Sequence, residues 1–582
     1  MPTLNWIGKD KVVSHHNDVP YRVLDCKYTF GDNSDSGNKI IHGDNLEVLK
    51  SLLPEYEGKV KCIYIDPPYN TGNEGWVYND NVSDPHIHKW LGKVVGSELD
   101  DLTRHDKWLC MMYPRLILLQ KLLSDDGSIF ISIDDNELAN LKLICNEIFG
   151  ASCFVANIGW QRAYTIRNDS KGIPTEVEHI LVYSKRPGWQ PNKLERTDEM
   201  DKLYKNPDND HTAWKAVPLT APGASSHQGM VHAIQHPFTG EMLYPTNRTH
   251  WRMQQDDILQ IMNQWTAYEL KDLHDEEKRA SVCGIPTKDV RKGVKAIVLC
   301  KSIEESKSDA EKIVKQGGWP VIYFSKNGFG GIGKKTYLSS VGGKVQTNFL
   351  SYSEVGHSDE ATRELKAIFD GKSPFDTPKP TRLLERIMQI ATDRDSIILD
   401  SFAGSGTTAH AVLNLNKLDG GDRKFVLCEM CDYADNITAE RVRRVIKGYG
   451  SGNNTVEGTD GSFDFYELGE TIFDPSSGNL NDNADTEQIR KYVWFSETNT
   501  SYTSPAEDSH PYLLGTFQHN NYYFYYIKGE DTCLDWDFLQ TFTLKDKAEM
   551  YIIYADRCVL TEEEMLKMNI RFKKIPRDIK RV

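Results

Sequence analysis

The chain has 582 residues, of which 39% are hydrophobic and 26% charged, as in a soluble globular protein with several domains. A formal net charge of −15 argues against a protein that simply coats nucleic acid, although it does not exclude a local basic groove. No apolar run is long enough to span a membrane, and the N-terminus lacks a signal peptide's apolar core. Together with eleven scattered cysteines, these features predict a cytoplasmic protein without a membrane partner.

The first part of the chain alternates predicted strands and helices. A strand over residues 39–42 precedes an amphipathic helix, for which Asp44 is a candidate N-cap. The alternation continues to about residue 149, which indicates a mostly parallel sheet with helices on both faces. We therefore predict an α/β fold with a doubly wound sheet.

A short buried strand within KVKCIYIDPPYNTG, residues 59–72, stops at an acid. Pro67 and Pro68 donate no hydrogen bond to a sheet, so the chain must leave it at Asp66. Ligands bind at the carboxyl ends of strands in α/β folds, which makes Asp66 and Tyr69 candidate site residues. A capped turn with Tyr69 covering the core explains these residues equally well.

The pattern changes between residues 191 and 345. This segment is polar, rich in turns and studded with Trp, Tyr and His, which predicts an inserted domain with exposed loops. Within it, GFGGIGKKT at 328–336 nearly matches a phosphate-binding loop, but Lys335 stands where the magnesium-binding hydroxyl belongs. We predict a flexible basic loop there.

The strand and helix pattern resumes after residue 345, and residues 399–409 read LDSFAGSGTTA. A strand ending at Asp400 enters a turn that contains Gly404 and Gly406, and a helix follows at once. Such a turn lets a ligand approach the backbone and the free N–H groups of the helix N-terminus. Glu429 ends the next strand, where an acid can bind ribose hydroxyls. These residues predict a nucleoside cofactor, either NAD or S-adenosylmethionine.

DPPY together with an F-x-G-x-G loop resembles the S-adenosylmethionine-dependent amino-methyltransferases of DNA. The DPPY segment comes first and the inserted segment lies between the two motifs, an order that resembles the β class of these enzymes. WIGKD, NPDND, LTAPG, VYSK, TPKPTRLLERI and FKKIPRDI resemble the modification subunits of type III restriction–modification systems. The resemblance implies a permuted, Rossmann-like methyltransferase sheet with an inserted target-recognition domain and a small C-terminal α+β domain.

The implied domain boundaries follow the composition of the chain. The two halves of the methyltransferase domain lie at 1–190 and 346–450, on either side of a target-recognition domain at 191–345. Residues 451–480, rich in Gly, Asn, Asp and Ser, are expected to be a linker, and residues 481–582 the small C-terminal domain.

The resemblance also assigns roles in methyl transfer. Asp66 and the Pro67 carbonyl accept hydrogen bonds from the target amino group, Pro68 stiffens the turn, and Tyr69 stacks on the flipped base. The methionine end of the cofactor is assigned to Phe402, Gly404, Gly406 and Thr407, and its ribose is assigned to Glu429. Asp44 binds the cofactor's adenine, Asp400 belongs to the same cofactor site, and Lys379 and Pro380 form a lid. The sequence offers no metal site.

The implied reaction is methylation of adenine N6 in double-stranded DNA. N4-cytosine methylation shares the mechanism, and a DNA-reading subunit for a partner nuclease is a further alternative. A nicotinamide dehydrogenase would leave residues 66–69 unexplained. As partners we expect duplex DNA, a second copy in a homodimer, and a restriction subunit with helicase and nuclease activity.

Two groups in the inserted segment are predicted to contact DNA. Arg248, His250, Trp251 and Arg252 lie in one polar and aromatic run, which suits contacts to base edges. Lys334 and Lys335 are expected on a glycine loop, which suits contacts to phosphates. A packed surface strand is the alternative for the first group.

Overall fold

The computed structural model describes residues 3–32, 36–71, 93, 103–164, 172–474, 477–500, 502–506, 508–541 and 548–580. The chain divides into two compact units. One unit joins Met1–Asn192 to Gln346–Val582, and the other is Lys193–Val345. The first unit is therefore built from both ends of the chain.

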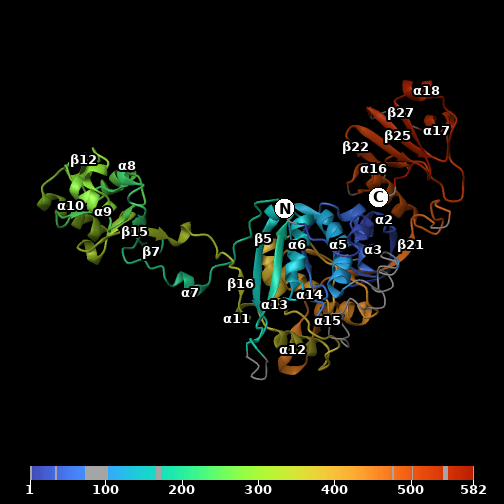
Figure 1. Cartoon of the computed structure of the whole chain (residues 1–582), viewed down its shortest axis with the longest axis horizontal. Coiled ribbons are helices and arrows are strands. Elements are labelled where there is room, and N and C mark those ends of the chain that lie inside the picture. Colours follow the sequence, from blue (N-terminus) through green and yellow to red (C-terminus); the bar gives the residue numbers. More distant parts are fainter. Residues whose placement is uncertain are drawn as a thin grey trace. The chain divides into compact units, whose positions relative to one another are not determined.

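A ten-stranded sheet forms the centre of the first unit, in the order β1-β21-β2-β18-β17-β3-β4-β6-β5-β16 (Figure 1). The neighbours from β21 to β4 pair in parallel. The pairs β1–β21, β4–β6 and β6–β5 are antiparallel. The predicted mostly parallel sheet is confirmed. The strands are β1 Arg22–Phe30, β2 Lys39–His42, β3 Val60–Ile65, β4 Leu123–Ile133, β5 Phe154–Gln161, β6 Val177–Ser184, β16 Phe349–Leu350, β17 Ile397–Asp400, β18 Lys424–Glu429 and β21 Phe463–Thr471.

Helices cover both faces of this sheet because strand side chains alternate between two apolar cores. Ile41, Ile63 and Ile129 pack with the helices on one face, where α3 contacts α5 and α5 contacts α6. A second set of packed helices consists of α13, α14 and α15, in which α14 contacts both others. The helices are α3 Asn45–Tyr56, α5 Arg104–Leu122, α6 Leu138–Ile148, α13 Thr381–Ala391, α14 Thr407–Asp419 and α15 Glu440–Lys447.

The prediction that residues 451–480 form a linker is wrong for the central part of this segment. Phe463–Thr471 forms β21, which pairs with β1 on one side and β2 on the other. Glycine and asparagine before residue 462 suggested a linker, but the alternating FDFYEL that follows completes the sheet. This nine-residue strand joins the sheet through backbone hydrogen bonds to segments more than 400 residues earlier in the chain. Local composition does not reveal such distant pairing.

The direction of the chain reverses between β3 and β17. From β3 the chain continues to its neighbour β4, whereas from β17 it continues to β18 on the opposite side. Ligands bind at such a switch point, outside the carboxyl ends of the strands. Asp66 follows β3 and Asp400 ends β17, so both lie at this crevice.

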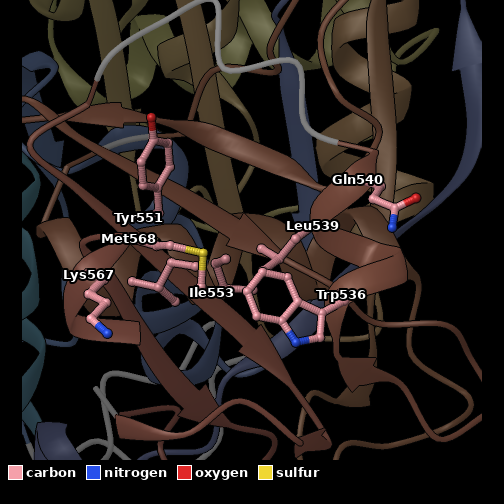
Figure 2. A pocket seen from close by; sticks show the side chains of 8 residues that line it. Trp536, Leu539, Gln540, Tyr551, Ile553, Lys567 and Met568 are labelled. Carbon is pink, nitrogen blue, oxygen red and sulfur yellow. The ribbon is translucent and has the colours of Figure 1, made fainter. Parts of the chain in front are cut away.

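The C-terminal residues of the first unit form a smaller sheet, β22-β23-β25-β27, with β22 antiparallel and the others parallel. A mostly apolar pocket of about 440 Å³ opens between this sheet and two short helices (Figure 2). Trp536 and Leu539 come from α17, Tyr551 and Ile553 from β25. The elements are α16 Thr486–Thr498, β22 Leu513–Phe517, β23 Asn520–Phe524, α17 Trp536–Gln540, β25 Met550–Ala555, α18 Glu562–Lys567 and β27 Ile570–Lys574.

The second unit contains short strands and three longer helices around its own apolar core. One sheet has the order β10-β9-β13-β12 and another β14-β15-β7. Its main elements are β7 Trp214–Val217, β9 Ile234–Gln235, β10 Met242–Leu243, β11 Thr249–Trp251, α8 Gln255–Met262, β12 Tyr268–Lys271, α9 Glu276–Cys283, β13 Ala296–Leu299, α10 Ile303–Gln316, β14 Ile322–Phe324 and β15 Ile332–Tyr337.

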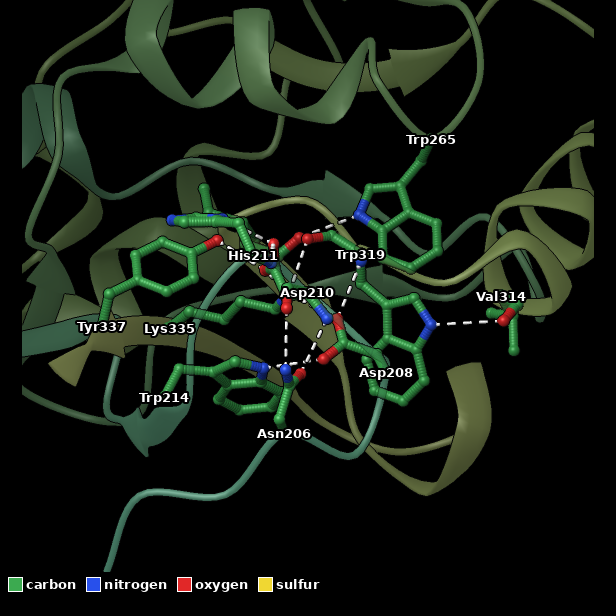
Figure 3. A network of polar contacts seen from close by, with 11 residues as sticks. Asn206, Asp208, Asp210, His211, Trp214, Trp265, Val314, Trp319, Lys335 and Tyr337 are labelled. Carbon is green, nitrogen blue, oxygen red and sulfur yellow. Dashed lines mark hydrogen bonds and ion pairs between the residues drawn. The ribbon is translucent and has the colours of Figure 1, made fainter. Parts of the chain in front are cut away.

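Lys335 does not reach the surface, so the predicted phosphate contact is wrong for this residue. It lies in strand β15, and its Nζ is 2.5 Å from Asp208 Oδ2 and 2.6 Å from Asp210 Oδ2 (Figure 3). It also donates to the Trp319 carbonyl at 2.7 Å. The NPDND segment supplies both acids, so its role is to hold a buried ion network.

The residues predicted to contact DNA bases, within 248–252, differ in their exposure to solvent. Trp251 is 1% exposed and donates to the His232 carbonyl, while His250 is buried and stacks on His227. Arg248 and Arg252, which flank the strand β11, are exposed. Only the two arginines of this run therefore remain candidates for contact with DNA.

Candidate active site at the carboxyl ends of the central strands

The chain after β3 is held by hydrogen bonds on both sides of Tyr69. Trp108 Nε1 donates to the Pro68 carbonyl at 2.6 Å. Asn70 has a positive φ of 60° and donates through Nδ2 to the buried carboxylate of Glu137. These anchors come from α5 and from the start of α6, so the DPPY segment is fixed to helices on one face of the sheet.

Asp66 accepts from two side chains. The Tyr69 hydroxyl donates to Asp66 Oδ1 at 2.8 Å, and the Lys379 ammonium donates to Asp66 Oδ2 at 2.6 Å. The same ammonium lies 3.0 Å from the Tyr69 hydroxyl and 5.1 Å from the centre of its ring. Lys379, which we expected beside the cofactor, is therefore also a partner of the predicted catalytic acid.

Glu178 completes this cluster and was missed in the sequence. It lies in β6 and is buried; its Oε2 is 3.4 Å from the Tyr69 hydroxyl and 3.8 Å from Lys379 Nζ. Arg162 donates to its other oxygen at 2.6 Å. An acid at the start of the apolar run EHILVYS was the available signal, because a charged group next to a buried strand requires a partner.

The glycine loop after β17 has the backbone geometry that its sequence predicts. Gly404 and Gly406 have φ values of 51° and 79°. A Cβ at Gly406 would lie 2.9 Å from the Thr438 carbonyl, so no larger residue fits without movement. Gly406 is the N-cap of α14, which begins at Thr407. The loop therefore presents backbone N–H groups of a helix N-terminus at the switch point.

Two buried acids support this loop. Glu429 Oε2 accepts from the Gly404 N–H at 2.8 Å, and Asp400 Oδ1 accepts from the Phe402 N–H at 3.0 Å. Burial raises the pKa of Asp400 to about 7 and the pKa of Glu429 to about 6. Within the described residues neither acid forms an ion pair. The carboxyl groups beside the loop are therefore partly protonated. A cationic ligand bound there would lower their pKa values and favour the ionised form.

A buried arginine lies behind the same loop. Arg441, from α15, donates through Nη1 to the hydroxyls of Ser405 and Thr407 at 2.9 and 2.7 Å. Its Nη2 donates to Thr381 Oγ1 at 3.1 Å and lies 3.3 Å from the Glu364 carboxylate. The guanidinium thus ties the glycine loop to the start of α13, immediately after Pro380.

One pocket brings the separate motifs together. It is lined by side chains from the ends of β3 and β17, from the glycine loop and from the segment before α13. The lining includes Asp66, Lys379, Asp400, Phe402, Gly404 and Thr407. Segments on either side of the inserted unit therefore contribute to a single site.

Asp44 and Pro380 have mainly structural contacts here. Asp44 caps α3 by accepting from the Leu46 N–H at 2.8 Å. It lies two residues after the end of β2, which is two strands away from β17. Arg115 approaches the Asp44 carboxylate to 3.7 Å. Pro380 is buried and is the N-cap of α13. The cap role of Asp44 that the sequence suggested is confirmed.

The residues that the structure describes contain neither a metal-binding cluster nor a membrane-spanning helix. No group of three or more His, Cys, Asp or Glu side chains in this part of the chain is arranged to hold a metal ion. Among the same residues, no helix combines the length and the apolar character needed to cross a bilayer.

Known proteins resemble this chain over most of its length. The sequence profile of a DNA methylase family matches residues 60–440. The StyLTI Mod subunit, a type III restriction-modification enzyme of Salmonella typhimurium, is 34% identical over 80% of this chain. The EcoP15I Mod subunit of Escherichia coli, also type III, is 31% identical over 77%. In both comparisons the chain spans 66% of the relative's own length. The type II methyltransferase M.KpnI of Klebsiella pneumoniae is 31% identical over 68% of this chain and 81% of its own.

Proposed function

The chain belongs to the DNA methylase family, and from this premise we propose that it methylates adenine N6 in duplex DNA, using S-adenosylmethionine. The observation that carries the proposal is the common pocket of Asp66 and the glycine loop at the strand switch point. A base inside a duplex cannot reach such a pocket and must be flipped out, at a cost of a few kcal/mol.

The residues of the site suit this reaction. Asp66 and the Pro67 carbonyl accept from the target amino group, which localises the lone pair of its nitrogen. Tyr69 stacks on the base. When bound, the cofactor would supply an electrophilic methyl group to the nitrogen lone pair; its sulfonium would become a neutral thioether, and the proton displaced from the nitrogen would pass to solvent.

The cofactor fits the buried acids and the tight loop. Asp400 and Glu429 lack an ion-pair partner among the described residues, and their raised pKa values indicate that a nearby positive charge would be favourable. Gly404, Gly406 and Thr407 offer backbone groups, with Phe402 against them; Glu429 is proposed to bind the ribose and Asp44 the adenine. Lys379 lines the same pocket, and Pro380 follows it as the N-cap of α13; the two remain the proposed lid.

The test uses purified protein, labelled S-adenosylmethionine and duplex DNA of mixed sequence. Label recovered as N6-methyladenine supports the proposal, and label found only as N4-methylcytosine would move the activity to the alternative. Asp66→Ala should abolish transfer while cofactor affinity stays within about twofold, because Asp66 serves the base and not the cofactor. Gly404→Trp should block cofactor binding.

We also propose that the second unit, Lys193–Val345, recognises the DNA sequence. It has exposed Arg248 and Arg252, and it is a compact unit inserted in the sequence between the two segments that form the first unit. Exchange of this unit for that of a related enzyme should change the methylated sequence and preserve adenine chemistry. A folded exchange variant that still marks the original sequence would contradict the assignment.

The similarity to type III Mod subunits supports a modification subunit as the role of the chain in the cell. A homodimer and a restriction subunit with helicase and nuclease activity follow as predicted partners. Light scattering of the purified protein tests the first. Co-purification with a candidate restriction subunit, compared with the same subunit alone, tests the second.

A further inference from the structure

The position of Lys379 conflicts with the role proposed for Asp66. Lys379 Nζ lies 2.6 Å from Asp66 Oδ2, and Tyr69 occupies the other oxygen at 2.8 Å. An amino group held by Asp66 would need a similar distance from the same carboxylate. An ammonium at that position would also repel the positive charge that develops on the target nitrogen. Lys379 must therefore leave Asp66 when the base enters.

The displaced ammonium is buried and is therefore most stable where a carboxylate faces it. The Lys379 side chain is only 10% exposed, and a buried charge without a partner is strongly unfavourable. Glu178 Oε2 lies 3.8 Å from Lys379 Nζ, so a movement of about 1 Å gives an ordinary charge-assisted hydrogen bond. Arg162 binds the opposite oxygen of Glu178, which orients the carboxylate toward the lysine.

The other nearby acid is less suited to this role. Asp400 receives hydrogen bonds from the Phe402 N–H of the glycine loop and from the Thr408 hydroxyl in the first turn of α14. A lysine there would compete with the cationic cofactor for the same carboxyl group. Glu178 lies in β6, on the far side of β4 from β3 and β17. Movement toward Glu178 therefore takes the ammonium away from the cofactor.

We propose that Glu178 is a positioning residue that receives the Lys379 ammonium when the target amino group replaces it at Asp66. The inference rests on the proposed function and adds a step to it. Before DNA binds, Lys379 neutralises Asp66. After the base enters, Lys379 is paired with Glu178, and Asp66 is available to the amino group.

A double-mutant cycle tests this hand-over. Glu178→Gln keeps the shape of the side chain but leaves Lys379 on Asp66, so kcat/KM for DNA should fall about tenfold, with cofactor affinity within twofold. Lys379→Met removes the competing ammonium. In the Lys379→Met background, Glu178→Gln should change kcat/KM less than twofold. Glu457→Gln, which removes a surface ion pair with Lys417, is the matched control and should have no effect.

Each other outcome contradicts the proposal. If Glu178→Gln costs the same factor in both backgrounds, Glu178 does not act through Lys379. If Lys379→Met and Lys379→Gln both abolish transfer while still binding cofactor and DNA, Lys379 is itself catalytic and is not displaced. If the wild-type protein methylates no DNA base, both the proposed function and the hand-over fail. The first two outcomes reject the hand-over alone, so the two kinds of failure can be distinguished.

Discussion

Two buried pairs of acids in this protein have opposite electrostatic environments. In the second unit, Asp208 and Asp210 share the Lys335 ammonium, and the resulting hydrogen bonds hold the pKa of Asp210 below its usual range despite its burial. In the first unit, burial raises the pKa values of Asp400 and Glu429, and the nearby charges of Asp66 and Glu429 raise the pKa of Asp400 further. This difference in electrostatic environment distinguishes a structural network from a binding site. The acids paired with Lys335 contribute to the fold, whereas acids without a cation favour a positively charged ligand.

The largest expected effect is on the neutralised pair. Lys335→Met removes the ammonium from the buried Asp208 and the half-buried Asp210, and it should lower the free energy of unfolding of the second unit by about 3–5 kcal/mol. Denaturant unfolding measures it, and cofactor affinity should not change. Lys334→Met, in the same strand with a half-buried side chain, is the control and should cost less than about 0.5 kcal/mol. Equal effects of the two substitutions would show that the network does not stabilise the unit.

The second prediction concerns the acids without a cation. The pKa of Asp400 is raised by burial to about 7, so the folded state holds a proton that the unfolded chain releases near pH 4. The stability from this proton is present below pH 4 and is lost as the pH rises through 7. Between pH 5 and pH 8 the loss should be about 2–3 kcal/mol, and Asp400→Asn should remove it. Parallel stability curves for wild type and variant would contradict the assignment.

Arg441 should show a smaller effect, mainly on the cofactor. Arg441→Lys keeps the charge but loses the forked contact with Ser405 and Thr407, so cofactor affinity should fall about tenfold. Arg444→Lys is the matched control, because Arg444 lies on the same helix with partners that do not touch the loop. Calorimetry with S-adenosylmethionine measures both. An unchanged affinity in Arg441→Lys would mean that the loop keeps its shape without the guanidinium.

The sequence predicts the part of the site that depends on local order. Pro67 after a buried strand and Gly404 and Gly406 before a helix determine backbone direction within a few residues, so their positions at strand ends follow from the chain alone. The pairing of Lys335 with Asp208 could not be predicted, because the two residues are brought together only by tertiary packing. Glu178 was missed for the same reason, and β21 because a strand joins a sheet through distant partners.

The place of β21 in the sheet has a consequence for synthesis on the ribosome. This strand separates β1 from β2, although it is made more than 400 residues after them. The growing chain therefore emerges with the edge of β2 uncovered, and the sheet stays incomplete until residue 471 has left the exit tunnel. A ribosome that stops earlier releases a fragment without a finished sheet. Premature termination should thus yield a substrate for proteolysis and not a shortened, partly active enzyme.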